Sequence, residues 1–163
     1  MIRIPMIVAV IAAFTPIEAQ AQASAVSLSS EVRVERVETG ADGGSRTVLK
    51  APATEKIVPG DRLVVTLTYA NRGSEPASGF VADNPLPAAV AFDSVREDWA
   101  LVSVDGGKSF GKLAALSVSE KAADGSSASR PAVPADVTHI RWAPAQPIAA
   151  GATGTLQYRG TVK

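Results

Sequence analysis

Apolar and polar residues alternate with a period of two along several short segments of this chain. The clearest segment is residues 61–73, DRLVVTLTYANRG, where Leu63, Val65, Leu67 and Tyr69 share one side of an extended backbone. β-Branched residues, which favour strands, dominate the other side. The pattern predicts a β-strand with one face in the core.

Turn residues mark both ends of this strand. Pro59 presets the first central position of a type II turn, Gly60 supplies the positive φ of the second, and Asp61 follows. Asn71 and Gly73 form a second turn signal after the strand. We therefore expect a strand whose entry and exit are both specified.

Shorter segments with strand composition occur along the rest of the chain, and none has a sustained helical period. In residues 31–38 the alternation slips by one residue, which indicates a bulged edge strand or a strand end, with residues 46–50 as a hairpin partner. The other expected strands are 80–82, 90–94, 99–104, 109–118, 137–142 and 155–162.

These strands predict the fold class: all-β, an antiparallel immunoglobulin-like β-sandwich, preceded by a signal peptide. Residues 24–163 are expected to form one domain of roughly 140 residues. Residues 121–136 are low in complexity and rich in Ala, Ser and Pro, which predicts a long, mobile loop.

Residues 1–23 have the layout of a secretory signal peptide. Arg3 precedes an apolar run over residues 4–14, and Ala-Gln-Ala repeats end at Ala21 and Ala23, where signal peptidase needs small residues. The alternative is an uncleaved anchor, but the run is short for a bilayer, which needs about 20 residues. We expect cleavage, no membrane insertion afterwards, and a location in the periplasm or outside the cell.

Composition narrows the classes of partner and cofactor. The chain has 16 basic and 16 acidic residues and no Cys. A chain without net charge is not expected to bind nucleic acid. Without cysteine the chain can form neither a disulfide nor the lipidated cysteine of a bacterial lipoprotein. Both methionines, Met1 and Met6, lie in the expected signal peptide, so no soft-metal site and no cofactor is expected.

The most distinctive motif is SVDGGKSF, residues 103–110. It fits the pattern Ser-x-Asp-x-Gly-x-Ser/Thr-aromatic and resembles the Asp box of sialidase-like propellers. A propeller needs several blades of about 40 residues each, and one copy cannot build it. We expect a hairpin turn in which Asp105 accepts backbone amides, Gly107 takes a left-handed conformation and Phe110 packs underneath, joining residues 99–104 to 109–118.

Residues of about 50–163 resemble the DUF11 or conserved repeat family, immunoglobulin-like modules of bacterial secreted and surface proteins. The matching elements, in order, are Pro59-Gly60-Asp61, strand 63–69, Asn71-Arg72-Gly73, residues 83–87, Phe92, Trp142, Ile148, Ala150-Gly151 and strand 155–162. Ala150 stands where the family usually has Pro, and Asn84 separates Asp83 from the Pro-Leu-Pro run. The resemblance implies an architecture and no catalytic residues.

Candidate chemistry elsewhere is sparse. His139 is the only histidine, and the sequence has no Gly-x-Ser-x-Gly motif, so a Ser-His-Asp hydrolase is not favoured. A zinc site needs three or four suitable ligands, and the sequence does not supply them. The adjacent Glu97 and Asp98 point to opposite strand faces and cannot act as a carboxylate pair. Calcium stays an alternative because four aspartates lie in or near expected loops: Asp83, Asp93, Asp98 and Asp105.

The aromatic residues divide into core candidates and one ligand candidate. Tyr69, Phe92, Trp142 and Tyr158 occupy strand positions that predict core packing. Trp99 lies in a polar Glu-Asp-Trp context and is the aromatic residue we expect to contact a ligand, if there is one.

These observations lead to one main hypothesis and two alternatives. We expect an exported, non-enzymatic structural or protein-interaction module whose partner is an unknown envelope or surface protein, bound through strand edges or loops. A small carbohydrate- or calcium-binding module around Trp99 and the Asp105 turn is the first alternative. A hydrolase using His139 is the second.

Overall fold

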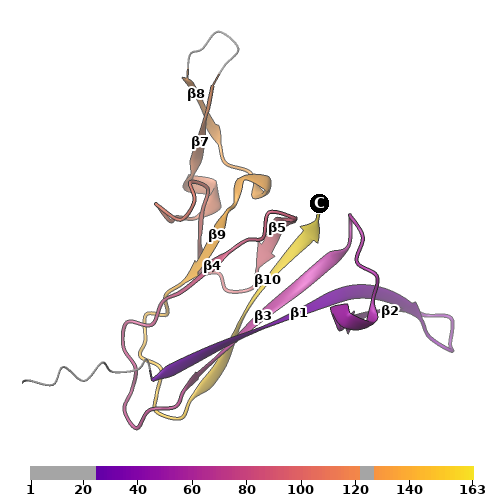
Figure 1. The fold of residues 1–163 in the computed structure, drawn as a ribbon, viewed down its shortest axis with the longest axis horizontal. Coiled ribbons are helices and arrows are strands. Elements are labelled where there is room, and N and C mark those ends of the chain that lie inside the picture. Colours follow the sequence, from indigo (N-terminus) through magenta and orange to yellow (C-terminus); the bar gives the residue numbers. More distant parts are fainter. Residues whose placement is uncertain (1–24, 122–126) are drawn as a thin grey trace, which may run out of the picture.

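The computed structural model describes residues 25–121 and 127–163. The predicted signal peptide therefore lies outside the described residues. Within them the chain forms ten strands, paired antiparallel throughout, and three short 3₁₀ helices (Figure 1). The predicted all-β class is confirmed.

The larger sheet has five strands in the order β2-β1-β3-β10-β5. Their bounds are β1 Val26–Thr39, β2 Ser45–Lys50, β3 Arg62–Asn71, β5 Val90–Val95 and β10 Thr153–Val162. β1 is long enough to pair with two strands: residues 26–34 pair with β3 and residues 34–39 pair with β2. The expected hairpin between β1 and β2 is present.

The smaller sheet has three strands in the order β4-β9-β6, namely Ala82–Pro85, His139–Trp142 and Leu101–Ser103. A separate hairpin of β7 (Ser117–Lys121) and β8 (Ser127–Pro131) stands away from the two sheets (Figure 1). The 3₁₀ helices are η1 (Pro52–Thr54), η2 (Leu113–Ala115) and η3 (Pro134–Asp136).

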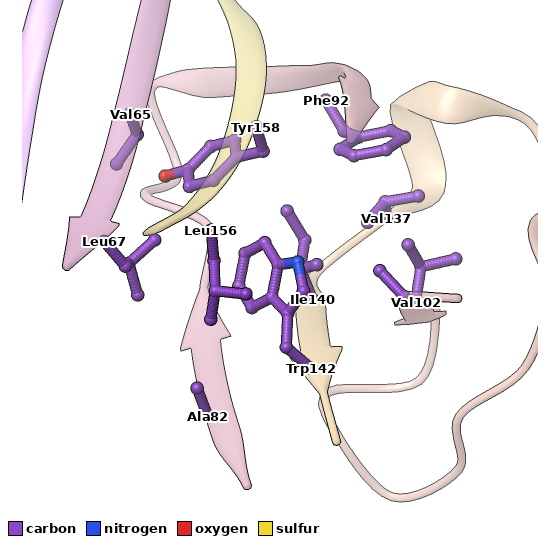
Figure 2. Close-up of a cluster of buried hydrophobic side chains, with 11 residues drawn as sticks. Val65, Leu67, Ala82, Phe92, Val102, Val137, Ile140, Trp142, Leu156 and Tyr158 are labelled. Atoms are coloured by element: carbon purple, nitrogen blue, oxygen red, sulfur yellow. The ribbon is translucent and has the colours of Figure 1, made fainter. Parts of the chain in front are cut away.

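One cluster of buried apolar side chains draws on both sheets, as Figure 2 shows. The five-stranded sheet contributes Val65, Leu67, Phe92, Leu156 and Tyr158, and the three-stranded sheet contributes Ala82, Val102, Ile140 and Trp142. Ile140 and Trp142 on β9 are completely buried. Each fully buried large side chain stabilises the fold by about 1.5–3 kcal/mol, so β9 anchors the small sheet on the large one.

Two strand predictions need correction. Residues 99–104 and 109–118 do not pair as neighbouring strands: β6 pairs with β9, and a single bridge, Val102 with Gly111, joins the two segments. The strand expected at residues 80–82 instead begins at Ala82 and includes Pro85. The physical reason in both cases is β9, which offers backbone partners to β4 and β6 from a distant part of the sequence.

The loop expected at residues 121–136 is also partly wrong. Residues 127–131 form β8, while residues 122–126 lie outside the described residues. Arg130 explains the order here, because it binds Glu120 on β7 at 2.6 Å and Asp136 at 2.6 and 2.8 Å. The guanidinium holds the pKa of Asp136 down at about 2.

Within the described ranges, no helix has the length and apolar character needed to cross a membrane.

Candidate functional site

The Asp105 turn gathers several hydrogen-bond donors around one carboxylate. One carboxylate oxygen, Oδ1, accepts the backbone N–H groups of Lys108 and Ser109, both at 3.0 Å, and the Ser103 hydroxyl at 2.7 Å. The other, Oδ2, accepts the Ser109 hydroxyl at 2.6 Å. These donors, Ser103 first among them, hold the pKa of Asp105 well below its usual range.

The geometry below the turn is fixed as well. Gly107 has a φ of +83°, and its Cα lies against the His139 ring, so a Cβ there would be 3.3 Å from the ring. Ser103 is fully buried and accepts the Gly107 N–H at 2.9 Å. The carboxylate is thus committed to holding its own turn.

Phe110 leaves the turn and meets a cation from the neighbouring sheet. The Arg141 guanidinium lies 3.7 Å from the centre of the Phe110 ring and binds Asp83 at 2.6 and 2.7 Å. Hydrogen bonds from Arg141 lower the pKa of Asp83. His139, the histidine considered for a hydrolase, is half-buried, and its Nδ1 lies 3.1 Å from the Thr138 hydroxyl.

The turn before β3 is closed in a similar way. The Asp61 N–H donates to the Val58 carbonyl at 3.1 Å, and Gly60 has a φ of +92°, as a type II turn requires. The Asp61 carboxylate accepts the Val58 N–H at 2.8 Å and both arms of Arg36 at 2.8 and 3.0 Å. Arg36 and this backbone bond lower the pKa of Asp61.

Asn71 connects the turn after β3 to the turn before β10. Its buried amide nitrogen donates to the carbonyls of Glu75 and Ile148 at 2.8 and 2.9 Å, with a third contact to Ala149. Its side-chain oxygen accepts the Gly73 N–H at 3.0 Å. The sequence predicts a turn at Asn71. It does not predict the hydrogen bond to the Ile148 carbonyl, because that partner lies 77 positions away in the chain.

The expected core aromatic residues do not all lie equally deep. Phe92, Trp142 and Tyr158 are buried, and Tyr69 is half-buried at the margin of the cluster. Burial raises the pKa of Tyr158. Tyr69 packs over Gly154, where a Cβ would come within 2.2 Å of its hydroxyl oxygen.

Glu97 is a structural residue that the sequence analysis missed. Its Oε2 accepts the Trp142 indole N–H at 2.9 Å and the Gln157 N–H at 3.2 Å. No local pattern indicates this role, because the partners come from β9 and β10. Glu97 satisfies the one polar atom of the buried indole.

Trp99 keeps 41% of its surface exposed. Asp98 and Ala100, its neighbours in sequence, line a hollow of about 260 Å³ whose walls also include Phe92 and Leu113. The four aspartates considered for calcium are dispersed: Asp83 binds Arg141, Asp93 accepts the Thr161 hydroxyl, Asp98 lines the hollow, and Asp105 holds its own turn. No group of three or more metal-binding side chains occurs among the described residues.

The first half of β1 contrasts with these closed sites. The Arg72 N–H donates to Ala25 on the β3 side, and the Gly40 N–H donates to Gly44 on the β2 side. Since successive residues of an antiparallel strand bond to opposite sides, odd-numbered residues of β1 bond to β3 and even-numbered residues face away from it. Leu28, Ser30 and Val32 thus direct backbone N–H and C=O groups to a side where no described strand lies before β2 begins to pair at Val34.

Apolar side chains accompany this free edge. Leu28 and Val32 lie on the face of the sheet that carries Tyr69 and Val65, yet they are 45% and 38% exposed. Leu28 also lines an open groove of about 860 Å³, together with residues 73–81. Figure 1 shows the start of β1 at the outer margin of the large sheet.

The strand predicted at residues 31–38 begins too late to include this edge, since β1 begins at Val26. The alternation of Leu28, Ser30 and Val32 carries the signal, but serine at the middle position hides it. Comparisons of the chain with protein-family models, with curated proteins and with solved structures find no match.

Proposed function

We propose that this chain is an exported, non-enzymatic β-sandwich of the immunoglobulin type that serves as a structural or protein-interaction module of the bacterial envelope. Two sheets that share one hydrophobic cluster support the sandwich. The ordered DUF11-like elements support the family, and the layout of residues 1–23 supports export to the periplasm or the cell exterior.

The free edge of β1 is the observation that carries the interaction role. Extended peptides bind such edges through main-chain hydrogen bonds, while pockets beside the edge select side chains. The edge over residues 28–32 offers backbone groups, and the adjoining groove with Leu28 offers apolar surface. Asp105, the carboxylate of the enzyme-like motif, holds its own turn, and Glu97 binds the Trp142 indole N–H.

Photo-crosslinking in the exporting cell tests this role. A photoreactive residue at position 30, on the free edge, should give specific protein adducts, while the same residue at position 108, exposed in the Asp105 turn, should give none. Equal labelling from both positions, or no adducts from position 30, would contradict an interaction module that works through β1.

Trp99 favours one second candidate, a small carbohydrate- or calcium-binding module. Its exposed indole can stack on a sugar ring, and the hollow beside Asp98 gives space for a ligand. Glycan-array binding and calorimetric titration with calcium test this candidate, with Trp99→Ala as the variant that should abolish sugar binding. Absence of binding by the unaltered protein rejects it.

A further inference from the structure

We propose that the partner of the β1 edge is a second copy of this chain, paired antiparallel through residues 28–32 about a two-fold axis at Ser30. This inference rests on the interaction role proposed above and names its partner. It follows from three properties of the edge: its bonding pattern, its side-chain spacing and its charges.

The bonding pattern is compatible with a two-fold axis. An axis at Ser30 places Ser30 opposite Ser30 of the other copy, and Leu28 opposite Val32 of the other copy. All of these residues direct their N–H and C=O groups outward. Three such pairs with two bonds each give about six backbone hydrogen bonds.

The side-chain spacing is self-complementary. Leu28 and Val32 lie on the same face, two residues before and two residues after Ser30. The axis therefore places Leu28 of each copy against Val32 of the other. Both are partly exposed in the single chain, and the contact removes apolar surface from water on both copies. The second copy thus supplies β1 with a third neighbouring strand, in addition to β2 and β3.

The charges also fit. On the opposite face the axis places Glu31 opposite Ser29 and Arg33 opposite Ser27, so like charges do not face each other directly. Arg33 already neutralises Glu31 of its own chain, with Nε–Oε1 at 2.8 Å. A chain with 16 basic and 16 acidic residues has no net charge to oppose its own association.

The neighbouring edge of the large sheet is less suited to pairing. β2 carries Arg46 and Lys50, which bind Glu38 at 3.5 and 2.6 Å. Charged side chains of this kind, lysine above all, protect an edge against further strands. Two-fold symmetric dimers are also the commonest form of protein self-association.

Oligomeric state and site-specific crosslinking of the chain purified from exporting cells test the proposal. Sedimentation velocity over a concentration series should show a monomer and a weak dimer, because a contact of one strand is small. Ser30→Lys places two cations together on the axis and should abolish the dimer. Ser29→Lys, the matched control, places the cation opposite Glu31 and should preserve or strengthen it.

Cysteine substitution checks the register, since the chain has no Cys of its own. Under mild oxidation Ser30→Cys should form a disulfide-linked dimer, and Ser29→Cys, which does not face its own counterpart, should form little. A chain that is monomeric at every concentration and does not crosslink through position 30 overturns the proposal.

The two proposals can fail separately. If the chain stays monomeric while position 30 crosslinks a different envelope protein, self-pairing is wrong and the interaction role stands. If the dimer forms but position 30 gives adducts only with the chain itself, self-pairing stands and a role in binding other proteins is wrong.

Discussion

The Asp105 turn and the first half of β1 handle polar groups in opposite ways. At the turn, one carboxylate receives four hydrogen bonds from residues within four positions of it. At the β1 edge, residues 28, 30 and 32 direct backbone groups away from the sheet. The motif with more polar residues, the Asp105 turn, uses them for its own hydrogen bonds. The number of polar residues in a motif therefore does not indicate where a protein binds a partner.

Every buried side-chain nitrogen or oxygen in the described part of the chain has a hydrogen-bond partner. The unused hydrogen-bonding groups of the β1 edge belong to exposed backbone, and substitutions should reveal the difference between closed and open regions. Substitutions at the hydrogen-bonded turns should lower the free energy of unfolding. Substitutions at the open edge of β1 should weaken association and leave the free energy of unfolding nearly unchanged.

The largest effect is expected at Asn71. Asn71→Ala removes the donor to the Glu75 and Ile148 carbonyls and the acceptor for the Gly73 N–H, and should lower the free energy of unfolding by about 3 kcal/mol. Urea denaturation measures the change. Asn84→Ala is the control, since its amide makes only long contacts of 3.2 and 3.4 Å. Equal stability of the two variants would show that Asn71 does not link the two turns.

Ser103 should show a smaller loss. Ser103→Ala removes a buried hydroxyl that donates to Asp105 and accepts the Gly107 N–H, at a cost of about 1–2 kcal/mol. Ser30→Ala, at the open edge, should change the free energy of unfolding by less than about 0.5 kcal/mol. If both variants have the same free energy of unfolding, the hydrogen bonds of the Asp105 turn do not stabilise the fold more than the open edge does.

Acid should weaken the closed turn in a defined pH window. The folded-state pKa of Asp105 lies below the unfolded value of about 3.9, so its stabilising contribution is complete above that value. The contribution is lost as the pH falls through the folded-state pKa. Asp105→Asn should therefore be less stable than the unaltered protein at pH 7 and approach it as the pH falls. Parallel curves in urea denaturation from neutral to acidic pH would contradict this.

The smallest effect is expected at the backbone of the open edge. Ser30→Pro removes an N–H that points away from β3, so the free energy of unfolding should change by no more than about 0.5 kcal/mol, while the dimer is lost. Ser29→Pro removes an N–H that bonds to β3 and should cost about 2 kcal/mol or more. Thermal unfolding of the pair measures the contrast, and a reversed order would show that the two sides of β1 are assigned the wrong way round.

Local signals in the sequence predict the parts of this fold that depend on neighbouring residues. The type II turn at Pro59 and Gly60, the strand that follows it, and the carboxylate-bonded turn at Asp105 all follow from residues close together in the chain. The pairing of β6 with β9 does not, because its partners lie more than 35 residues apart. The same holds for Glu97, whose role depends on Trp142 and Gln157.

The free edge belongs to both categories. The alternation of Leu28, Ser30 and Val32 is compatible with an extended strand, although the predicted strand begins at residue 31, and only the placement of β2 shows that one side of β1 stays open. An edge is defined by what does not pair with it, and a single segment of sequence holds no such information.

Residue-resolved amide hydrogen exchange of β1 at two protein concentrations tests the central claim most directly. In dilute solution the amides of residues 28, 30 and 32 should exchange rapidly while those of 27, 29, 31 and 33 are protected, because only the second set bonds to β3. At high concentration the first set should become protected too. Uniform protection of residues 27–33 in dilute solution, or rapid exchange of residues 28, 30 and 32 at every concentration and with every partner, would contradict an edge that is open and used for pairing.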